Sequence, residues 1–220
     1  MIERKLHFVW LGGSPRGAIL GRCLRSFHEH CPGFEIEEWN ESRIPRDPYL
    51  EFCLERRRWA NASNYLRLWI LHEHGGIYVD TDMEVLRPLD DLLETDFFAG
   101  FEGVGLCRVG EWLPDREVAI VNNAIMGSRK RNPFLARCLS QYSRIFDGGE
   151  AANLSGPHFM TYMLAGDGLP LAGWAVERDL RRGEVTIHAR ERFYPIGWDG
   201  SGEVGAASFT LHHWMASWQR

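Results

Sequence analysis

A strand that runs into two closely spaced carboxylates constrains this chain more than any other feature. After Gly75 and Gly76, the residues Ile77-Tyr78-Val79 are β-branched or aromatic, which predicts a buried strand. Asp80 and Asp82 follow at its end. Two carboxylates are costly there unless a positive charge lies between them. Mg²⁺ and Mn²⁺ take oxygen ligands and keep positions open for phosphates, so the stretch predicts a metal–diphosphate site.

The same Asp-x-Asp spacing also occurs in turns, where aspartate caps backbone groups. The length, composition and charge of the chain therefore help to limit what the motif can mean. The 220 residues suit one domain, 1–220, and 45% hydrophobic with 25% charged residues is ordinary for a soluble globular protein. The net charge of −5 argues against a nucleic-acid-binding surface, which would need a basic patch.

Cysteine usage and apolar runs indicate the compartment. The five cysteines form no Cys-x-x-Cys pair and leave one thiol over in any disulfide scheme, which favours reduced thiols in a cytosol. The N-terminus enters a strand without a long apolar signal segment, and no window approaches the ~20 apolar residues of a membrane span. We expect a cytoplasmic protein without a transmembrane segment, and peripheral contact with a membrane stays open.

The opening of the chain predicts the fold class. Residues 6–11 form an apolar strand that ends in Gly12-Gly13, where the backbone can approach a ligand closely. A helix over 17–30 and a second strand over 34–39 follow. This order favours an α/β fold with a mainly parallel central sheet flanked by helices and a right-handed crossover.

The helix predicted over 59–74 leads directly into the strand with the two aspartates. Asn64 and Arg67 stand three residues apart on it and project from neighbouring positions, so both side chains can reach the acid pair. Further strands are predicted over 97–101, 118–121, 185–187 and 192–194, and further helices over 133–146 and 157–164.

Several segments, in this order, resemble one family. They are residues 6–13, 62–67, 75–82, 155–157 and 212–218. Together they resemble the DXD-containing sugar transferases of glycosyltransferase family 32, and equally the related catalytic domains of the large glucosylating cytotoxins. The resemblance spans nearly the whole chain. It implies a single GT-A domain, a nucleotide-sugar donor with a UDP-sugar favoured, Mn²⁺ or Mg²⁺, and transfer with retention at the anomeric carbon to a glycan or glycoconjugate acceptor.

The resemblance also implies roles for individual residues. It implies that Val9 and Trp10 contact the base of the donor. It also implies that the donor sugar and diphosphate are bound by Asn64, Arg67 and Asp80, which are the expected catalytic residues as well. The remaining roles fall to Asp82 with Asp80, His213 and Ser217 as metal ligands, and to Trp218 over the donor. Asn123 lies outside the segments that carry the resemblance, and it either shapes a turn or lies near the donor or acceptor. His212 and His213 are adjacent, so in a strand they face opposite ways, and we favour His213 as the ligand.

One position departs from the family pattern, which usually has Ser-Asp where this chain has Ser63-Asn64. Asparagine keeps a hydrogen bond to a sugar hydroxyl but loses its charge-assisted form. Three alternatives therefore stay open. The chain could be an effector-like transferase that glycosylates a protein or small molecule, a catalytically weak nucleotide-sugar-binding protein, or a metal-dependent phosphohydrolase built on Asp80 and Asp82.

Overall fold

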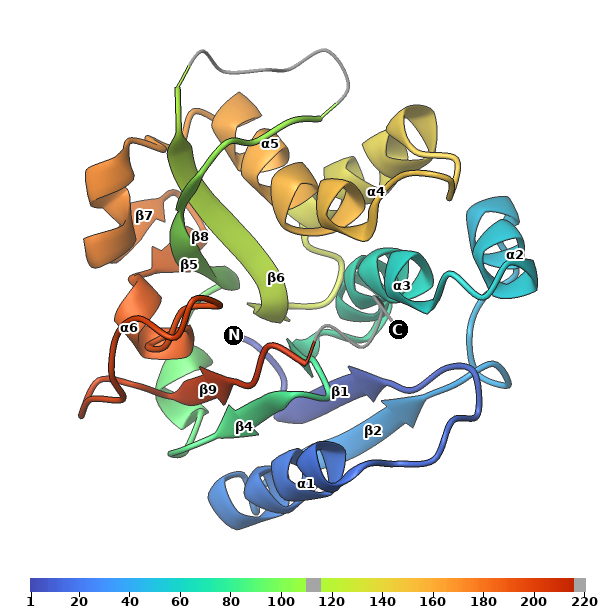
Figure 1. Cartoon of the computed structure of the whole chain (residues 1–220), viewed down its shortest axis with the longest axis horizontal. Coiled ribbons are helices and arrows are strands. Elements are labelled where there is room, and N and C mark those ends of the chain that lie inside the picture. The colour runs from blue at the N-terminus through green and yellow to red at the C-terminus, as the bar shows by residue number, and fades with distance from the viewer. Residues whose placement is uncertain (110–115, 216–220) are drawn as a thin grey trace.

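The sheet that the opening strand–helix–strand pattern predicts forms the centre of the molecule (Figure 1). A computed structural model describes residues 1–109 and 116–215. The strands are β1 (Lys5–Val9), β2 (Glu35–Trp39), β3 (Gly76–Val79), β4 (Met83–Val85), β5 (Phe97–Gly105), β6 (Val118–Ser128), β7 (Leu180–Arg182), β8 (Val185–His188) and β9 (Thr210–His212). The α-helices are α1 (Ala18–His30), α2 (Pro48–Glu55), α3 (Trp59–His74), α4 (Pro133–Ile145), α5 (Phe159–Gly166) and α6 (Arg190–Phe193). Short turns of other helix types are η1 (Asp90–Leu92), η2 (Leu154–His158) and η3 (Gly173–Glu177).

Strand order confirms the predicted α/β class. The described residues form a seven-stranded sheet in the order β2-β1-β3-β6-β5-β8-β7, and β4 pairs with β9 in a separate antiparallel ribbon. Strands β2, β1, β3, β5 and β8 run in one direction, while β6 and β7 run in the other. The antiparallel β6 lies between β3 and β5, so its middle passes the end of β3 where the two aspartates follow.

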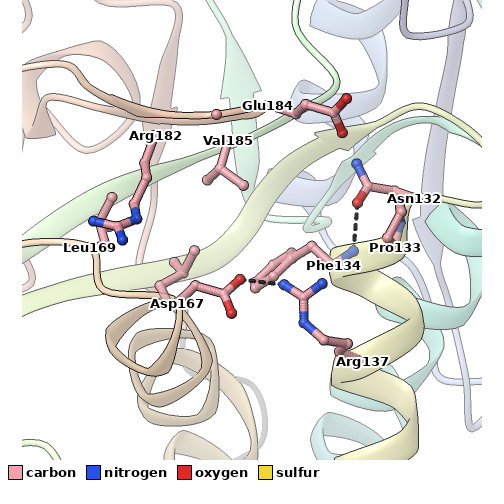
Figure 2. A pocket seen from close by; sticks show the side chains of 11 residues that line it. Asn132, Pro133, Phe134, Arg137, Asp167, Leu169, Arg182, Glu184 and Val185 are labelled. Atoms are coloured by element: carbon pink, nitrogen blue, oxygen red, sulfur yellow. Dashed lines mark hydrogen bonds and ion pairs between the residues drawn. The ribbon is translucent and has the colours of Figure 1, made fainter.

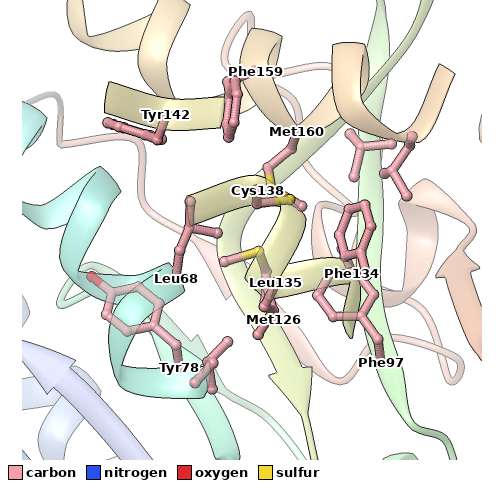
Figure 3. Close-up of a cluster of buried hydrophobic side chains, with 14 of the residues drawn as sticks. Leu68, Tyr78, Phe97, Met126, Phe134, Leu135, Cys138, Tyr142, Phe159 and Met160 are labelled. Carbon is pink, nitrogen blue, oxygen red and sulfur yellow. The ribbon is translucent and has the colours of Figure 1, made fainter. Parts of the chain in front are cut away.

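The two faces of the sheet bury separate hydrophobic clusters. Because side chains alternate along a strand, Tyr78 of β3 faces α3, α4 and α5, whereas Ile77 and Val79 face α1, β4 and α6. Figure 3 shows Tyr78 beside Leu68 and Met126 in the first cluster. This alternation decides which face each polar residue after β3 can reach.

Two predicted boundaries are wrong. Residues 192–194 were expected to be a strand, but Arg190–Phe193 form one helical turn, α6, closed by the Tyr194 N–H on the Arg190 carbonyl at 2.8 Å. The strand predicted to end at Val121 continues to Ser128, because β3 and β5 pair with it on both sides. Tertiary pairing therefore overrides the low strand propensity of its asparagines.

The five cysteines are buried free thiols, as their spacing predicts. In residues 1–109 and 116–215, no helix is long and apolar enough to cross a bilayer.

A buried histidine fixes the turn between α3 and β3. His7 of β1 is fully buried and donates through Nε2 to the carbonyl of Gly75 at 2.9 Å. Its Nδ1 accepts the indole N–H of Trp39 at 3.1 Å, which selects the neutral tautomer. Gly75 itself has φ +68°, a conformation that favours glycine. Burial lowers the pKa of His7 to about 4.

We expect this histidine to make the fold acid-sensitive. The unfolded chain binds the proton with a pKa of about 6.5 and the folded chain with a pKa of about 4, so the contribution is complete above pH 6.5 and lost as pH falls toward 4. His7 should account for roughly 2 kcal/mol of the loss between pH 7 and pH 5. Urea unfolding of His7→Gln should show a shallower decline, and the exposed control His28→Gln should follow the wild type. Equal slopes for His7→Gln and the wild type would contradict the assignment.

Candidate functional site

A buried ion pair between α3 and the end of β3 forms the centre of the site. Arg67 Nη2 lies 3.0 Å from Asp80 Oδ1, and Nη1 lies 3.3 Å from Oδ2. The Arg67 side chain is only 5% exposed and that of Asp80 25%. The two parallel contacts match the planar guanidinium to the carboxylate plane, the geometry in which arginine holds an anion most firmly.

The rest of the guanidinium is held by protein oxygens. Nε donates to the Ser63 carbonyl at 3.2 Å, Nη2 to the Ser63 hydroxyl at 3.1 Å, and Nη1 to the Asn123 carbonyl at 2.6 Å. Together with the hydrogen bond from Nη1 to Asp80 Oδ2 and the ion-pair contact from Nη2 to Oδ1, these surround the guanidinium with protein oxygens. Arg67 in this state therefore positions Asp80.

A tyrosine that sequence reasoning did not select completes this arrangement. The Tyr78 hydroxyl donates to Asp80 Oδ1 at 2.8 Å and shares a 2.9 Å hydrogen bond with the Ser63 hydroxyl. The strand period of two places Tyr78 and Asp80 on one face, and this signal could have identified it. Burial raises the pKa of Asp80 above its usual value, although the Arg67 charge opposes that rise.

Asn64 and Asn123 form a second polar contact beside the ion pair. Asn123 Nδ2 donates to Asn64 Oδ1 at 3.0 Å, and Asn64 Nδ2 donates to the Ala152 carbonyl at 2.8 Å. Both side chains are buried, and the backbone of Gly156 lies against Asn64 closely enough that a Cβ there would come within 2.9 Å of Oδ1. The structure therefore brings Asn64, Arg67, Asp80 and Asn123 together.

The Asp82 carboxylate has a different set of contacts. Its Oδ2 accepts the backbone N–H of Met215 at 2.9 Å, and its Oδ1 lies 3.3 Å from His212 Nε2. His213 instead places Nε2 3.0 Å from Glu84 Oε2, so the structure brings His212 and not His213 to the Asp82 carboxylate. Burial by itself raises the pKa of Asp82, but His212 and the Met215 N–H outweigh it and leave the pKa below its usual value.

The predicted base-binding residues lie at the end of β1. Val9 is buried, while Trp10 is partly exposed and donates its indole N–H to the Ser14 carbonyl at 3.2 Å, across the Gly12–Gly13 turn. Ser217 and Trp218 lie outside the described residues, so their predicted roles stay predictions.

The donor set around Asp82 fits an open divalent-cation site. In the described part of the chain, no group of three His, Cys, Asp or Glu side chains is arranged as a closed metal site. Asp82 and His212 supply a carboxylate and an imidazole, and the buried Nδ1 of His212 has no hydrogen-bond partner among the described residues. Mg²⁺-type sites commonly use one or two carboxylates and take further ligands from phosphates, so a two-residue protein contribution suits that chemistry.

A separate groove of about 290 Å³ lies between the start of α4, the end of α5 and the β7–β8 turn. Figure 2 shows the Arg137–Asp167 ion pair across it. None of the candidate site residues lines this groove, and we assign it no part in the site.

Comparison with known proteins shows which proteins this chain is similar to. Residues 20–99 match the family described as "Glycosyltransferase sugar-binding region containing DXD motif". An uncharacterized glycosyltransferase, L373, of Acanthamoeba polyphaga mimivirus is 34% identical over 44% of this chain and 42% of its own. A human alpha-1,4-N-acetylglucosaminyltransferase is 28% identical over 72% of this chain and 44% of its own. The chain thus spans less than half the length of these two relatives.

A solved structure agrees with the fold. The UDP-bound glycosyltransferase domain of the YGT toxin superposes with a TM-score of 0.53 at 12% identity, over 86% of this chain and 80% of that one. Residues 20–99 therefore carry a DXD-type sugar-binding region like that of glycosyltransferases, and the fold matches that of a solved glycosyltransferase domain, in agreement with the resemblance seen in the sequence.

We expect Asn64→Asp to destabilise the protein. The new carboxylate oxygen would face the Ala152 carbonyl, where the amide now donates a 2.8 Å hydrogen bond, at a cost of about 1–3 kcal/mol. Asn40 is the matched control, because it uses its oxygen to accept from Ser42. Chemical unfolding at pH 7 measures both variants. Asn64→Asp at wild-type stability would contradict the assigned amide orientation.

The buried ion pair predicts unequal effects for two arginine substitutions. Arg67→Met leaves Asp80 without its counter-charge and should lower the unfolding free energy by about 3–5 kcal/mol. Arg22→Met removes an exposed partner of Glu84 and should cost below about 1 kcal/mol. Urea unfolding of both variants measures the two losses of unfolding free energy. Losses of similar size would show that burial of the Arg67–Asp80 pair has little effect on stability.

Proposed function

We propose that this chain is a metal-dependent, retaining glycosyltransferase that moves a hexose or N-acetylhexosamine from a UDP-sugar to a glycan or glycoconjugate. One observation carries the proposal. Asp80 has a fixed counter-charge in Arg67, whereas Asp82, two residues later, is held by His212 and a backbone N–H. Asp82 is thus the carboxylate that a bound cation would stabilise.

The comparisons favour the donor and the stereochemistry. The YGT domain was solved with UDP bound, and the human relative is named for an α-1,4 linkage. Transfer from an α-configured nucleotide sugar to an α-linked product retains the configuration at the anomeric carbon. Both points support the same reaction for this chain.

The residues then divide the work. Asp82 and His212 would hold Mn²⁺ or Mg²⁺, which when bound neutralises charge on the departing diphosphate. Asp80, held rigid by Arg67 and Tyr78, keeps acceptor capacity on Oδ2 for a hydroxyl of the donor. No side chain is assigned as general base, because in a front-face transfer the departing phosphate can take the proton of the acceptor hydroxyl.

Binding of UDP tests this assignment without an acceptor. We expect Mn²⁺ to strengthen UDP binding to the wild type, and Asp82→Asn and His212→Ala each to lose about tenfold or more of the Mn²⁺-dependent affinity, equal to about 1.4 kcal/mol. His213→Ala should retain it, because His213 lies on Glu84. Calorimetry with Mn²⁺ and with EDTA measures each variant. Loss in His213→Ala with retention in His212→Ala would restore the expectation drawn from sequence.

A further inference from the structure

Glu102 is a further carboxylate, on the side of the central sheet that faces His212, and it has no role in the reaction above. Glu102 of β5 is partly buried, and its Oε2 accepts a hydrogen bond from Asn122 Nδ2 of β6. In the described residues it forms no ion pair. A carboxylate left without a cation at a polar site is costly unless something else satisfies it.

The backbone explains why Glu102 points where it does. The register pairs Phe101 with Val121 and Gly103 with Ile120, so Glu102 is the extra residue of a β-bulge. Bulges redirect a side chain out of the regular alternation and are common beside active sites. Val121 lies in the cluster under α3 to α5, so Asn122 projects from the opposite face, and Glu102 lies on that same side because it accepts the hydrogen bond of Asn122.

Asn122 positions the carboxylate of Glu102. Its Oδ1 accepts the backbone N–H of Ala124 at 2.7 Å, which fixes the amide so that Nδ2 donates to Glu102. The Ala124 carbonyl in turn accepts the Asp80 N–H at 2.7 Å. One short stretch of β6 therefore ties Glu102 to the Asp80 backbone.

Neighbouring residues place Glu102 on the His212 side of the sheet. Gly100, two residues before Glu102 in β5, lies against Tyr194, because a Cβ there would come within 3.3 Å of the Tyr194 ring. Tyr194 in turn packs on His212 with ring centroids 5.9 Å apart. Burial raises the pKa of Glu102, and the nearby His212 acts against that rise. Glu102 thus lies beside His212, which with Asp82 would hold the cation at the diphosphate. The sugar attached to that diphosphate must lie nearby.

We propose that Glu102 accepts a hydrogen bond from a hydroxyl of the transferred sugar, with Asn122 as its positioning residue. This inference rests on the proposed function and adds a sugar-recognising group to the same site. Oε1, which has no hydrogen-bond partner in the described part of the chain, is the oxygen that receives the hydroxyl.

The test separates the sugar from the nucleotide. Glu102→Gln can still accept from Asn122 while presenting an amide in place of the free carboxylate oxygen. We expect calorimetry with Mn²⁺ to give UDP affinities within twofold of wild type, and the affinity for the tightest binder among UDP-glucose, UDP-galactose and UDP-N-acetylglucosamine to fall about tenfold. Glu203→Gln, at an exposed position, is the control and should change neither.

Monodeoxy donors identify the contact. In the wild type one monodeoxy analogue of that UDP-sugar should bind about tenfold more weakly, and in Glu102→Gln the same deletion should have no further effect. Glu102→Asp provides a second, charged variant should the glutamine form unfold, and it should also weaken the UDP-sugar but not UDP.

Three results would overturn the inference. The first is wild-type UDP-sugar affinity in both Glu102 variants, and the second is a loss confined to the acceptor KM. The third is an equal loss for UDP and UDP-sugar, which would show a structural role. Failure of UDP to bind the wild type would instead overturn the proposed function, and this inference with it.

Discussion

The bidentate pair between Arg67 and Asp80 is the interaction on which the site depends. It joins a helix to the end of a strand, and both partners are largely removed from water. A buried pair contributes little net stability by itself, since desolvation offsets most of the attraction. What it fixes is geometry, because four hydrogen bonds and one ion-pair contact hold the guanidinium in one orientation and the carboxylate follows it.

The antiparallel strand β6 makes this geometry available. Its backbone supplies the Asn123 carbonyl to Arg67 and the Ala124 carbonyl to Asp80, and its side chains reach Asn64 on one face and Glu102 on the other. A helix on the sheet could not offer free carbonyls in this way, since its own ladder uses them. Ladder pairing of β3 with β6 ends at Ile125, just before these groups are needed.

Much of this arrangement was accessible from the sequence, for reasons that particular residues make clear. The strand that leads to Asp80, the helix over 59–74 and the contact of Arg67 with Asp80 depend on local periodicity, which a sequence displays directly. Asn64 instead contacts Asn123 and the Ala152 carbonyl. The place of His212 beside Asp82 depends on β4 pairing with β9 across 129 residues, from Met83 to His212, and adjacency alone could not choose between the two histidines. Glu102 depends on a bulge, which leaves no local signature in the sequence.

The two aspartates of the motif are therefore chemically different despite their spacing. Asp80 follows Tyr78 onto the α3 face and is neutralised by a fixed arginine, whereas Asp82 meets the β9 face, where its partners are a histidine and an amide. A fixed guanidinium beside Asp82 would repel a divalent cation, and an unpaired Asp80 would compete for it. In the proposed reaction, dividing the charges in this way would direct the cation to one carboxylate and leave the other rigid and able to accept a hydroxyl. The division follows from the turn after β3, in which the Met83 N–H donates to the Asp80 carbonyl at 3.0 Å, because strand alternation alone would place residues 80 and 82 on the same face.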